Sequence, residues 1–269
     1  KNPVLDITDS ALSAGLVSYW KMDDGSGQTV TDSVGSNHGT LGADSNAASD
    51  DPVWASAGSK VGTNALLFDG VNDYIKIPHS ATLNPNGNKM TISIWIKTSQ
   101  QTGNIPGFID KPGGTQATYS INLSSARVGF MYIAAYSPVN STTSVNDGKW
   151  HHVVCTAGSS GKFVYVDGVL ENSVGDTNNF NLNTNDVNIG RRAEYSAYFS
   201  GAIDDVAFWN RTLSASEVAA LYSIQGRYTH AGAGINGGTA APKWETVNWA
   251  RSSGPYYGEP LERPPVAYW

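Results

Sequence analysis

The segment Met90-Thr-Ile-Ser-Ile-Trp-Ile-Lys97 decides the fold class, because its aliphatic side chains recur at every second position. In an extended chain, successive side chains point to opposite faces. The even positions from Met90 to Ile96 therefore form an apolar face, and the odd positions from Thr91 to Lys97 form a second, mixed face. This period of two predicts a β-strand with one face in a core.

Similar short runs occur before and after this segment, separated by turns rich in Gly, Asn and Ser. Asp167-Gly168 is typical of a tight turn and predicts a hairpin between residues 163–166 and 169–171. The further runs predicted as strands are 16–22, 65–68, 74–77, 150–156, 162–166, 186–190 and 202–209. Many short strands joined by turns indicate an all-β sandwich or jelly roll.

One helix is predicted, near residues 214–222. Ser214 and Glu217 have the spacing of a capping box, in which Ser214 is the N-cap and Glu217 reaches back to it. Val218, Leu221 and Tyr222 then form one apolar helix face. The predicted fold is a two-sheet antiparallel jelly-roll sandwich with one short C-terminal helix.

The composition separates several classes of protein. Hydrophobic residues make up 40% of the 269 residues and charged residues 15%, which suffices for a core and excludes a disordered chain. The net charge is −6 and the sequence contains no run of Lys and Arg, so it lacks the basic surface of a nucleic-acid binder. A mildly acidic surface is better suited to Ca²⁺ and neutral ligands. No apolar stretch reaches the ~20 residues that span a bilayer. Cys155 is the one cysteine and is predicted to be a buried thiol.

The chain divides into three parts. Residues 1–15 are interpreted as a lead-in segment and 16–225 as the sandwich. Residues 226–269 are rich in Pro and aromatic side chains, which does not fit a solvated linker. They are predicted to form either a strap over the sandwich or a contact surface for a partner, other copies of this chain included.

Eight motifs, in order along the chain, resemble the laminin G-like, concanavalin A-like domains of bacterial extracellular proteins and, more distantly, pentraxins. The resemblance covers roughly residues 16–224 and includes Val17-Ser-Tyr-Trp-Lys-Met-Asp-Asp-Gly-Ser-Gly27, Ala65-Leu-Leu-Phe-Asp-Gly-Val-Asn-Asp-Tyr-Ile75, Trp150-His-His-Val-Val154, Val164-Tyr-Val-Asp-Gly168 and Gly201-Ala-Ile-Asp-Asp-Val-Ala-Phe-Trp-Asn-Arg-Thr-Leu-Ser214. It implies a jelly roll, often with one structural Ca²⁺, that serves as a sugar-binding module, an adhesin or an appendage of a larger enzyme. It also implies an extracellular or cell-surface location.

Calcium requires six to eight oxygen ligands from carboxylates and carbonyls. Because the first and last strands are neighbours in the resembled fold, acids of the N-terminal loops could converge with the last strand. The predicted ligands are Asp23, Asp24, Asp32 and Asp205. Strand alternation allows only one of Asp204 and Asp205 to face the metal, and Asp205 is favoured. In the alternative interpretation, the loop aspartates only form turns.

Aromatic side chains are the expected platforms for sugars, with polar groups beside them for the hydroxyls. Asp110, Lys111 and Glu194 are expected to lie near the candidate tyrosines named below and to supply such polar groups. The alternative is that the tyrosines are ordinary half-buried strand residues, as the four Trp of the motifs are expected to be core. The predicted ligand-binding residues are Tyr119, Tyr136, Arg191, Arg192, Tyr195 and Tyr198.

The motifs of common hydrolases are missing from the sequence: there is no Glu-x-Asp-x-x-Glu, no Gly-x-Ser-x-Gly and no His-Glu-x-x-His. The sequence therefore predicts a non-catalytic, extracellular module that binds a carbohydrate or cell-surface glycan, or mediates adhesion. The alternative is a structural subunit of an extracellular assembly or filament, pilin-like or of a surface layer, whose C-terminal tail docks on a neighbouring copy.

Overall fold

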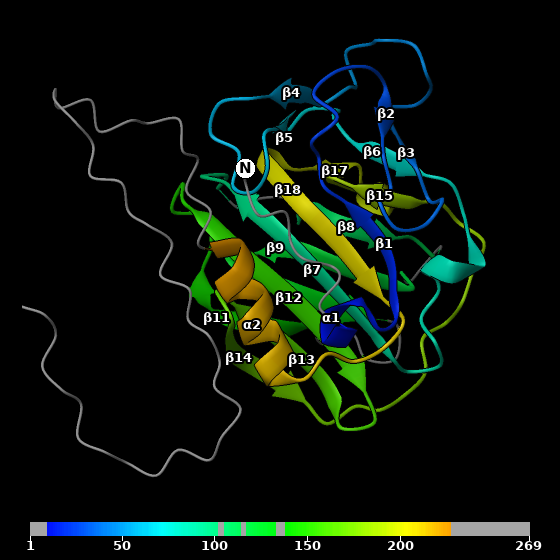
Figure 1. Cartoon of the computed structure of the whole chain (residues 1–269), viewed down its shortest axis with the longest axis vertical. Helices are drawn as coiled ribbons and strands as arrows, with labels where there is room; N and C mark the ends of the chain where they lie inside the picture. Colours follow the sequence, from blue (N-terminus) through cyan, green and yellow to red (C-terminus); the bar gives the residue numbers. More distant parts are fainter. Residues whose placement is uncertain (1–9, 102–104, 114–116, 133–137, 227–269) are drawn as a thin grey trace, which may run out of the picture. The chain divides into compact units, whose positions relative to one another are not determined.

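Two antiparallel sheets of eight strands each pack face to face in the computed structural model (Figure 1). The structure describes residues 10–101, 105–113, 117–132 and 138–226, which all lie within one compact unit. The predicted fold class, a two-sheet jelly-roll sandwich with a short C-terminal helix, is confirmed. Residues 1–9 of the lead-in and 227–269 of the tail lie outside the described residues.

The first sheet, sheet 1, has β7 and β18 at its centre. Its strands, in order across the sheet, are β14 (Val169–Val174), β13 (Gly161–Val166), β12 (Trp150–Gly158), β7 (Met90–Lys97), β18 (Ser200–Trp209), β5 (Ala65–Asp69) and β4 (Val53–Ala55), with β1 (Leu16–Trp20) paired to β18.

The second sheet, sheet 2, is built largely from the middle of the chain. Its strands, in order, are β11 (Val139–Ser144), β10 (Arg127–Tyr132), β9 (Tyr119–Ser124), β8 (Gly107–Lys111), β15 (Val187–Ile189), β6 (Ile75–Ile77), β3 (Gly39–Leu41) and β2 (Thr29–Val30). A short 3₁₀ turn, η1 (Ala81–Leu83), follows β6. Strands β8 to β11 were not predicted.

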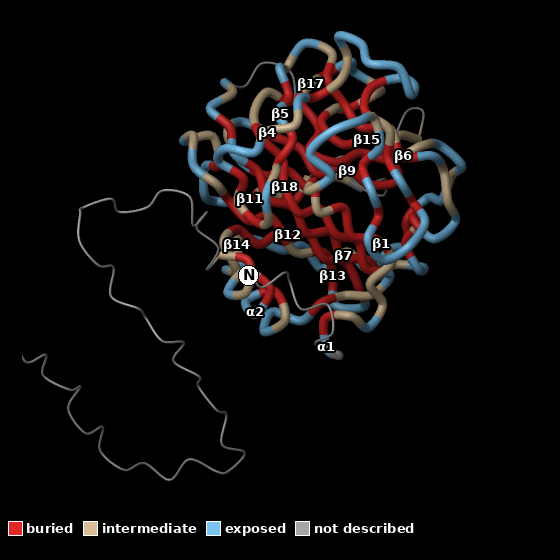
Figure 2. Tube along the Cα trace, turned by 45° about the horizontal axis from the view of Figure 1, so that its top comes forward, coloured by how far each residue is buried: buried red, intermediate tan, exposed pale blue. Residues whose placement is uncertain are grey.

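The core lies between the sheets and appears as the red interior of Figure 2. The apolar face predicted for β7 is confirmed, since Met90, Ile92, Ile94 and Ile96 are fully buried there. From sheet 2, Ile109, Ile121 and Phe130 meet them, among other residues. Cys155 is a buried free thiol, as predicted.

A second apolar layer covers the outer face of sheet 1, where α1 (Ser10–Ser13) and α2 (Ala215–Gly226) lie. The predicted capping box is confirmed: the Ser214 amide donates to Glu217 Oε2 (2.8 Å), and the Glu217 amide donates to Ser214 Oγ (3.3 Å). Val218 and Leu221 of α2 pack on Tyr19 and Trp209. Three of the four motif tryptophans are buried, and Trp150 is half-buried.

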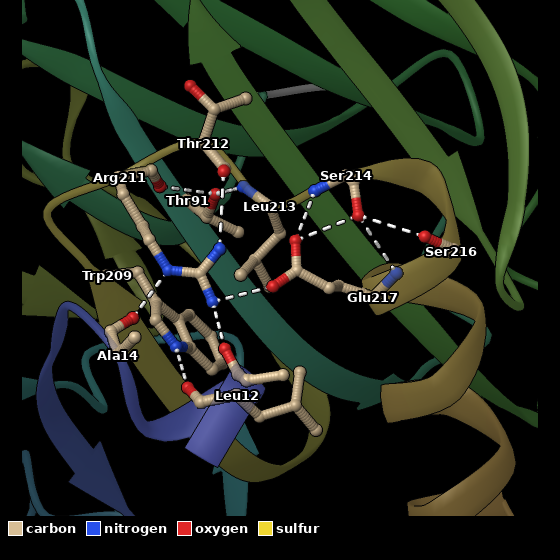
Figure 3. Close-up of polar contacts among 11 residues, drawn as sticks. Leu12, Ala14, Thr91, Trp209, Arg211, Thr212, Leu213, Ser214, Ser216 and Glu217 are labelled. Atoms are coloured by element: carbon tan, nitrogen blue, oxygen red, sulfur yellow. Dashed lines mark hydrogen bonds and ion pairs between the residues drawn. The ribbon is translucent and has the colours of Figure 1, made fainter. Parts of the chain in front are cut away.

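Arg211 connects both helices to the sandwich (Figure 3). Its guanidinium donates to the carbonyls of Ala11 and Ala14 and forms an ion pair with Glu217 (2.7 Å). Trp209 Nε1 donates to the Leu12 carbonyl (2.7 Å). Residues 11–15 are therefore part of the domain and more than a lead-in.

Candidate functional site

A hairpin at residues 191–198 lies on the outer face of sheet 2. It consists of β16 (Arg191–Arg192), the 3₁₀ turn η2 (Ala193–Tyr195) and β17 (Ala197–Tyr198). The hairpin approaches β8 so closely that a Cβ at Gly107 would lie 2.6 Å from the Arg191 carbonyl oxygen. Glycine at position 107 therefore allows the hairpin to pack directly on the sheet.

The hairpin carries four of the six predicted ligand-binding residues. The Tyr195 side chain is 58% exposed, and the Arg192 guanidinium lies 4.2 Å from its ring centroid. The Arg191 guanidinium lies 3.4 Å from the ring centroid of Tyr74, and its Nε donates to Asn188 Oδ1 (3.0 Å). Tyr198 is half-buried at the hairpin base. The exposed ring and the held cations form a surface of the kind that packs against a sugar.

The other two predicted ligand residues do not join this surface. Tyr119 faces the inter-sheet core, is fully buried and donates its hydroxyl to the Leu83 carbonyl (3.2 Å). A ring without exposed area offers no platform for a sugar, so the prediction for Tyr119 is wrong. Tyr136 lies outside the described residues.

Polar side chains form the floor below the hairpin. In β8, Ile109 faces the core, and Asp110 therefore points to the outer face of sheet 2, paired in register with Ser120 and Asn188. All three polar residues are at most 2% exposed. Lys111 alternates to the other face, where its Nζ donates to the Asn185 carbonyl (2.7 Å).

Asp110 is a buried carboxylate with an unusual environment. Its Oδ2 accepts from the Ala193 amide (3.3 Å), while its Oδ1 has no hydrogen-bond partner. Burial raises the pKa of Asp110 to about 7, and Glu194 adds to the increase, whereas Ser120, the Ala193 amide and Arg192 oppose it. Perturbed pKa values of this kind gather at functional sites, although structural networks also produce them.

The second group of interest is the pair Asp204 and Asp205 on β18. Ile203 and Val206 both face the inter-sheet core, so the two aspartates between them share the opposite face. A register shift in the β18–β7 pairing and a φ of 46° at Asp205 mark a β-bulge here. The prediction that only one aspartate could face a metal is wrong, because the bulge interrupts the alternation.

Both aspartates are buried and only partly satisfied. Asp204 Oδ2 accepts from the amides of Lys60 (2.8 Å) and Val61 (3.0 Å), and Asp205 Oδ1 accepts from the Tyr19 hydroxyl. Asp204 Oδ1 and Asp205 Oδ2 have no partner. Burial raises the pKa of both carboxyls, and Asp205 adds its charge at Asp204.

The three loop acids predicted as further calcium ligands are engaged elsewhere. Asp32 accepts four backbone N–H groups, from Tyr19, Val34, Gly35 and Asn37, at 3.0 Å each. Asp24 accepts from the Thr31 amide, and Asp23 from the amides of Thr63 and Asn64.

These contacts are those of loop- and turn-forming aspartates. Within the part of the chain that the structure describes, no group of three or more His, Cys, Asp or Glu is arranged to hold a metal ion. The four predicted ligands therefore do not form one metal-binding group, although Asp23 lies near enough to the bulge for its charge to raise the pKa of both Asp204 and Asp205.

Comparison with known proteins gives one family match. A family model described as the concanavalin A-like lectin/glucanases superfamily, laminin G type, matches residues 69–219, more than half of the chain. No curated protein sequence matches. Among the described helices, none is long and apolar enough to cross a membrane.

Several solved structures share the fold. Domain 4 of AbnA, a GH43 extracellular arabinanase from Geobacillus stearothermophilus, in complex with arabinotriose, is 19% identical with a TM-score of 0.59; the match covers 77% of this chain and 98% of that domain.

A Trypanosoma rangeli sialidase in complex with sialic acid is 18% identical with a TM-score of 0.57, covering 84% of this chain and 36% of the sialidase. The binding domain of botulinum neurotoxin serotype G is 17% identical with a TM-score of 0.58, covering 78% and 51%. At these identities the likeness shows the fold alone. Enzymes and binding domains both contain it.

Proposed function

The chain belongs to the concanavalin A-like lectin/glucanases superfamily, and from this premise we propose that it is a non-catalytic, extracellular carbohydrate-binding module. We place the ligand on the 191–198 hairpin. The observation that carries the proposal is the exposed Tyr195 ring beside Arg192, above the buried polar floor of Asp110 and its neighbours. Sugars pack their C–H faces on aromatic rings while nearby polar groups fix the hydroxyls.

The environment of the carboxylates supports binding over hydrolysis. A glycosidase needs two carboxyl groups that flank the scissile bond. Glu194 lies near enough to Asp110 to influence its pKa, but its Oε1 accepts from the Gly113 amide (2.9 Å). Asp110 has no exposed area and accepts from Ala193 of the hairpin. Both carboxylates accept hydrogen bonds that hold the hairpin in place, and Asp110 is closed to solvent.

The relatives give further support. The match spans nearly all of the arabinanase domain that was solved with arabinotriose, so a domain of this size with this fold occurs together with a sugar. The match spans only about a third of the sialidase chains and about half of the neurotoxin binding domain. The activities of those whole proteins are therefore not carried over to this chain.

A glycan array tests the proposal, with binding to each positive glycan then measured by calorimetry. The Tyr195→Ala variant removes the exposed ring, and we expect about a tenfold loss of affinity, or ~1.4 kcal/mol. Val169→Ala is the matched control, because Val169 is 62% exposed on β14, away from the hairpin. Sugar release should be checked on the same samples. Equal affinity of the Tyr195→Ala variant and the wild type would refute the site, and sugar release would refute the non-catalytic role.

We also propose a structural Ca²⁺ at the Asp204–Asp205 bulge, with fewer protein ligands than the sequence predicts. The observation that favours it is the pair of buried carboxylate oxygens without a partner. Further ligands would have to be carbonyl and water oxygens, since the described residues supply no third acid in place. A ligand that binds only the folded state stabilises it by about 2.7 kcal/mol at ~100 times its Kd.

Thermal melting with and without Ca²⁺ tests this proposal. EDTA should lower the Tm of the wild type and of Asp44→Asn, an exposed loop control, but not that of Asp205→Asn. An identical Tm of the wild type in excess Ca²⁺ and in EDTA would contradict the site.

A further inference from the structure

The two adjacent histidines of β12 lie in different environments. Successive residues of a strand point to opposite faces, so His151 and His152 do not share partners. His152 is fully buried under α2, where its ring stacks with Tyr222 and its Nε2 lies 2.7 Å from Ser93 Oγ. His151 is 8% exposed and lies at the start of β12, between two turns that each carry an aspartate.

His151 contacts a carboxylate at both ring nitrogens. Its Nδ1 lies 2.8 Å from Asp167 Oδ2, in the turn between β13 and β14, and its Nε2 lies 3.1 Å from Asp147 Oδ1, in the turn between β11 and β12. A neutral imidazole has one donor and one acceptor nitrogen, whereas an imidazolium has two donors. Because ionised carboxylates only accept, both contacts are satisfied at once by the protonated ring alone.

The surrounding charges favour this protonated form. The hydrogen bond to Asp167 raises the pKa of His151, burial lowers it, and Asp147 adds to the increase. The Lys149 amide holds the pKa of Asp147 at about 2; burial raises the pKa of Asp167, but its hydrogen bonds, including the one to His151, lower it overall. Lys149 Nζ lies 3.1 Å from Asp147 Oδ2, and Lys60 lies near enough to Asp167 for their charges to interact.

The turn that carries Asp147, residues 146–149, is also attached to the chain that follows β7. Asn146 Nδ2 donates to the Gln100 carbonyl (3.2 Å). The Gly148 amide donates to the Thr98 carbonyl (2.9 Å). The position of the turn therefore affects residues 98 and 100.

Those two residues hold the base of the 191–198 hairpin. Thr98 Oγ1 donates to the Ser200 carbonyl (2.6 Å). The side-chain amide of Gln100 donates to the Tyr198 carbonyl (3.0 Å) and accepts from the Ser200 amide (3.1 Å). A continuous set of hydrogen bonds thus leads from the His151 ring to the hairpin that carries the proposed site.

We infer that His151 is a pH-sensitive clamp: its imidazolium holds the 146–149 turn against the β13–β14 turn, and its deprotonation loosens the 146–149 turn and the base of the 191–198 hairpin. The pKa of His151 is raised above its usual value of about 6.5, so the clamp is fully present below about pH 6.5 and is lost as the pH rises through the folded-state pKa. The inference does not rest on the proposed function, because the turn and the hairpin base can be followed without a sugar.

An NMR titration of the full chain tests the protonation of the ring. The imidazole signal of His151, assigned by its absence from His151→Gln, should titrate above about pH 6.5. Asp167→Asn and Asp147→Asn should each lower that pKa. Asp167→Asn should keep the turn, because Asn tolerates the φ of 51° at this position and can still accept from the His152 amide. Asp44→Asn, an exposed loop control, should leave the pKa unchanged.

Hydrogen exchange tests the release of the two segments. In the wild type, the protection factors of the Gly148 and Ser200 amides should fall about tenfold as the pH rises through the His151 pKa. In Asp167→Asn the same fall should occur at lower pH, and in His151→Gln the protection should be low throughout.

Two results would overturn the inference. The first is a His151 ring that titrates at or below about pH 6.5 in the wild type. The second is protection at Gly148 and Ser200 that does not change as His151 titrates, because the histidine would then have a structural role only. Should His151→Gln fail to fold, the imidazole signal whose pKa moves in both Asp147→Asn and Asp167→Asn assigns His151, and the wild-type titration remains the test.

Discussion

Replacing Arg211 should loosen both helices from the sandwich at once. Its guanidinium joins the carbonyls of Ala11 and Ala14, at the end of α1, to Glu217 in the first turn of α2 (Figure 3). These segments are about 200 residues apart in the sequence. A planar guanidinium with several N–H donors can contact two carbonyls and one carboxylate at the same time, which an ammonium group cannot do with the same geometry.

The magnitude follows from the contacts. Hydrogen bonds to charged groups contribute roughly 1.5–3 kcal/mol each when buried. The Arg211 side chain is 25% exposed and that of Glu217 22%, so water recovers part of this on substitution. For three contacts we expect Arg211→Ala to lower the free energy of unfolding by about 2–4 kcal/mol. Arg211→Lys keeps a positive charge beside Glu217 but loses the several donors of the guanidinium, and should lower the free energy of unfolding by about half as much.

Urea unfolding followed by tryptophan fluorescence measures this change, and thermal melting provides a second measure. At roughly 2–4 °C per kcal/mol for a domain of this size, Arg211→Ala should lower the Tm by about 5–15 °C. Arg127→Ala, an exposed arginine on β10, is the control and should stay within about 0.5 kcal/mol. A change at Arg211 as small as at Arg127 would refute the view that this residue holds the helices.

Two further predictions concern the turn acid and the tail. Asp32→Ala should lower the free energy of unfolding by about 2–4 kcal/mol, because it removes the acceptor of four backbone amides. Burial raises the pKa of Asp32, but the backbone hydrogen bonds outweigh it and hold this pKa below its usual value, so the stabilisation is present above about pH 4 and is lost as the pH falls through the folded-state pKa. Asp32→Asn should therefore show a shallower acid transition than the wild type. Residues 227–269 lie outside the described residues, and their deletion separates the two interpretations of the tail. If the tail is a strap, deletion should lower the Tm of the monomer; if the chain is a filament subunit, deletion should leave a folded monomer that no longer assembles. Rapid proteolysis of the tail without either change would show that it is a dispensable extension.

Local patterns predicted those parts of the fold in which one face, turn or cap dominates. Strand β7 has the predicted bounds because its alternation is uninterrupted from Met90 to Lys97. The Asp167-Gly168 turn forms with φ values of 51° and 80°, as a primed hairpin turn requires. The helix begins at its capping box but extends to Gly226 rather than Tyr222.

The site was harder to predict, because it depends on which face each side chain occupies. No strand was predicted at Tyr119–Ser124, and Tyr119 was predicted to be a sugar platform. Its alternation with Ile121 and Leu123 was the available signal that it faces the core. At Asp204 and Asp205 the signal was the spacing of Ile203 and Val206, which cannot both face the core in a regular strand. Only the tertiary structure places Asp110 under the 191–198 hairpin.

The central claim is that a sugar binds on the 191–198 hairpin, and a crystal structure of the chain soaked with a glycan selected on the array tests it most directly. The account predicts a sugar ring packed against the exposed Tyr195 ring, beside Arg192. A sugar bound on another face, with the hairpin empty, would contradict the account.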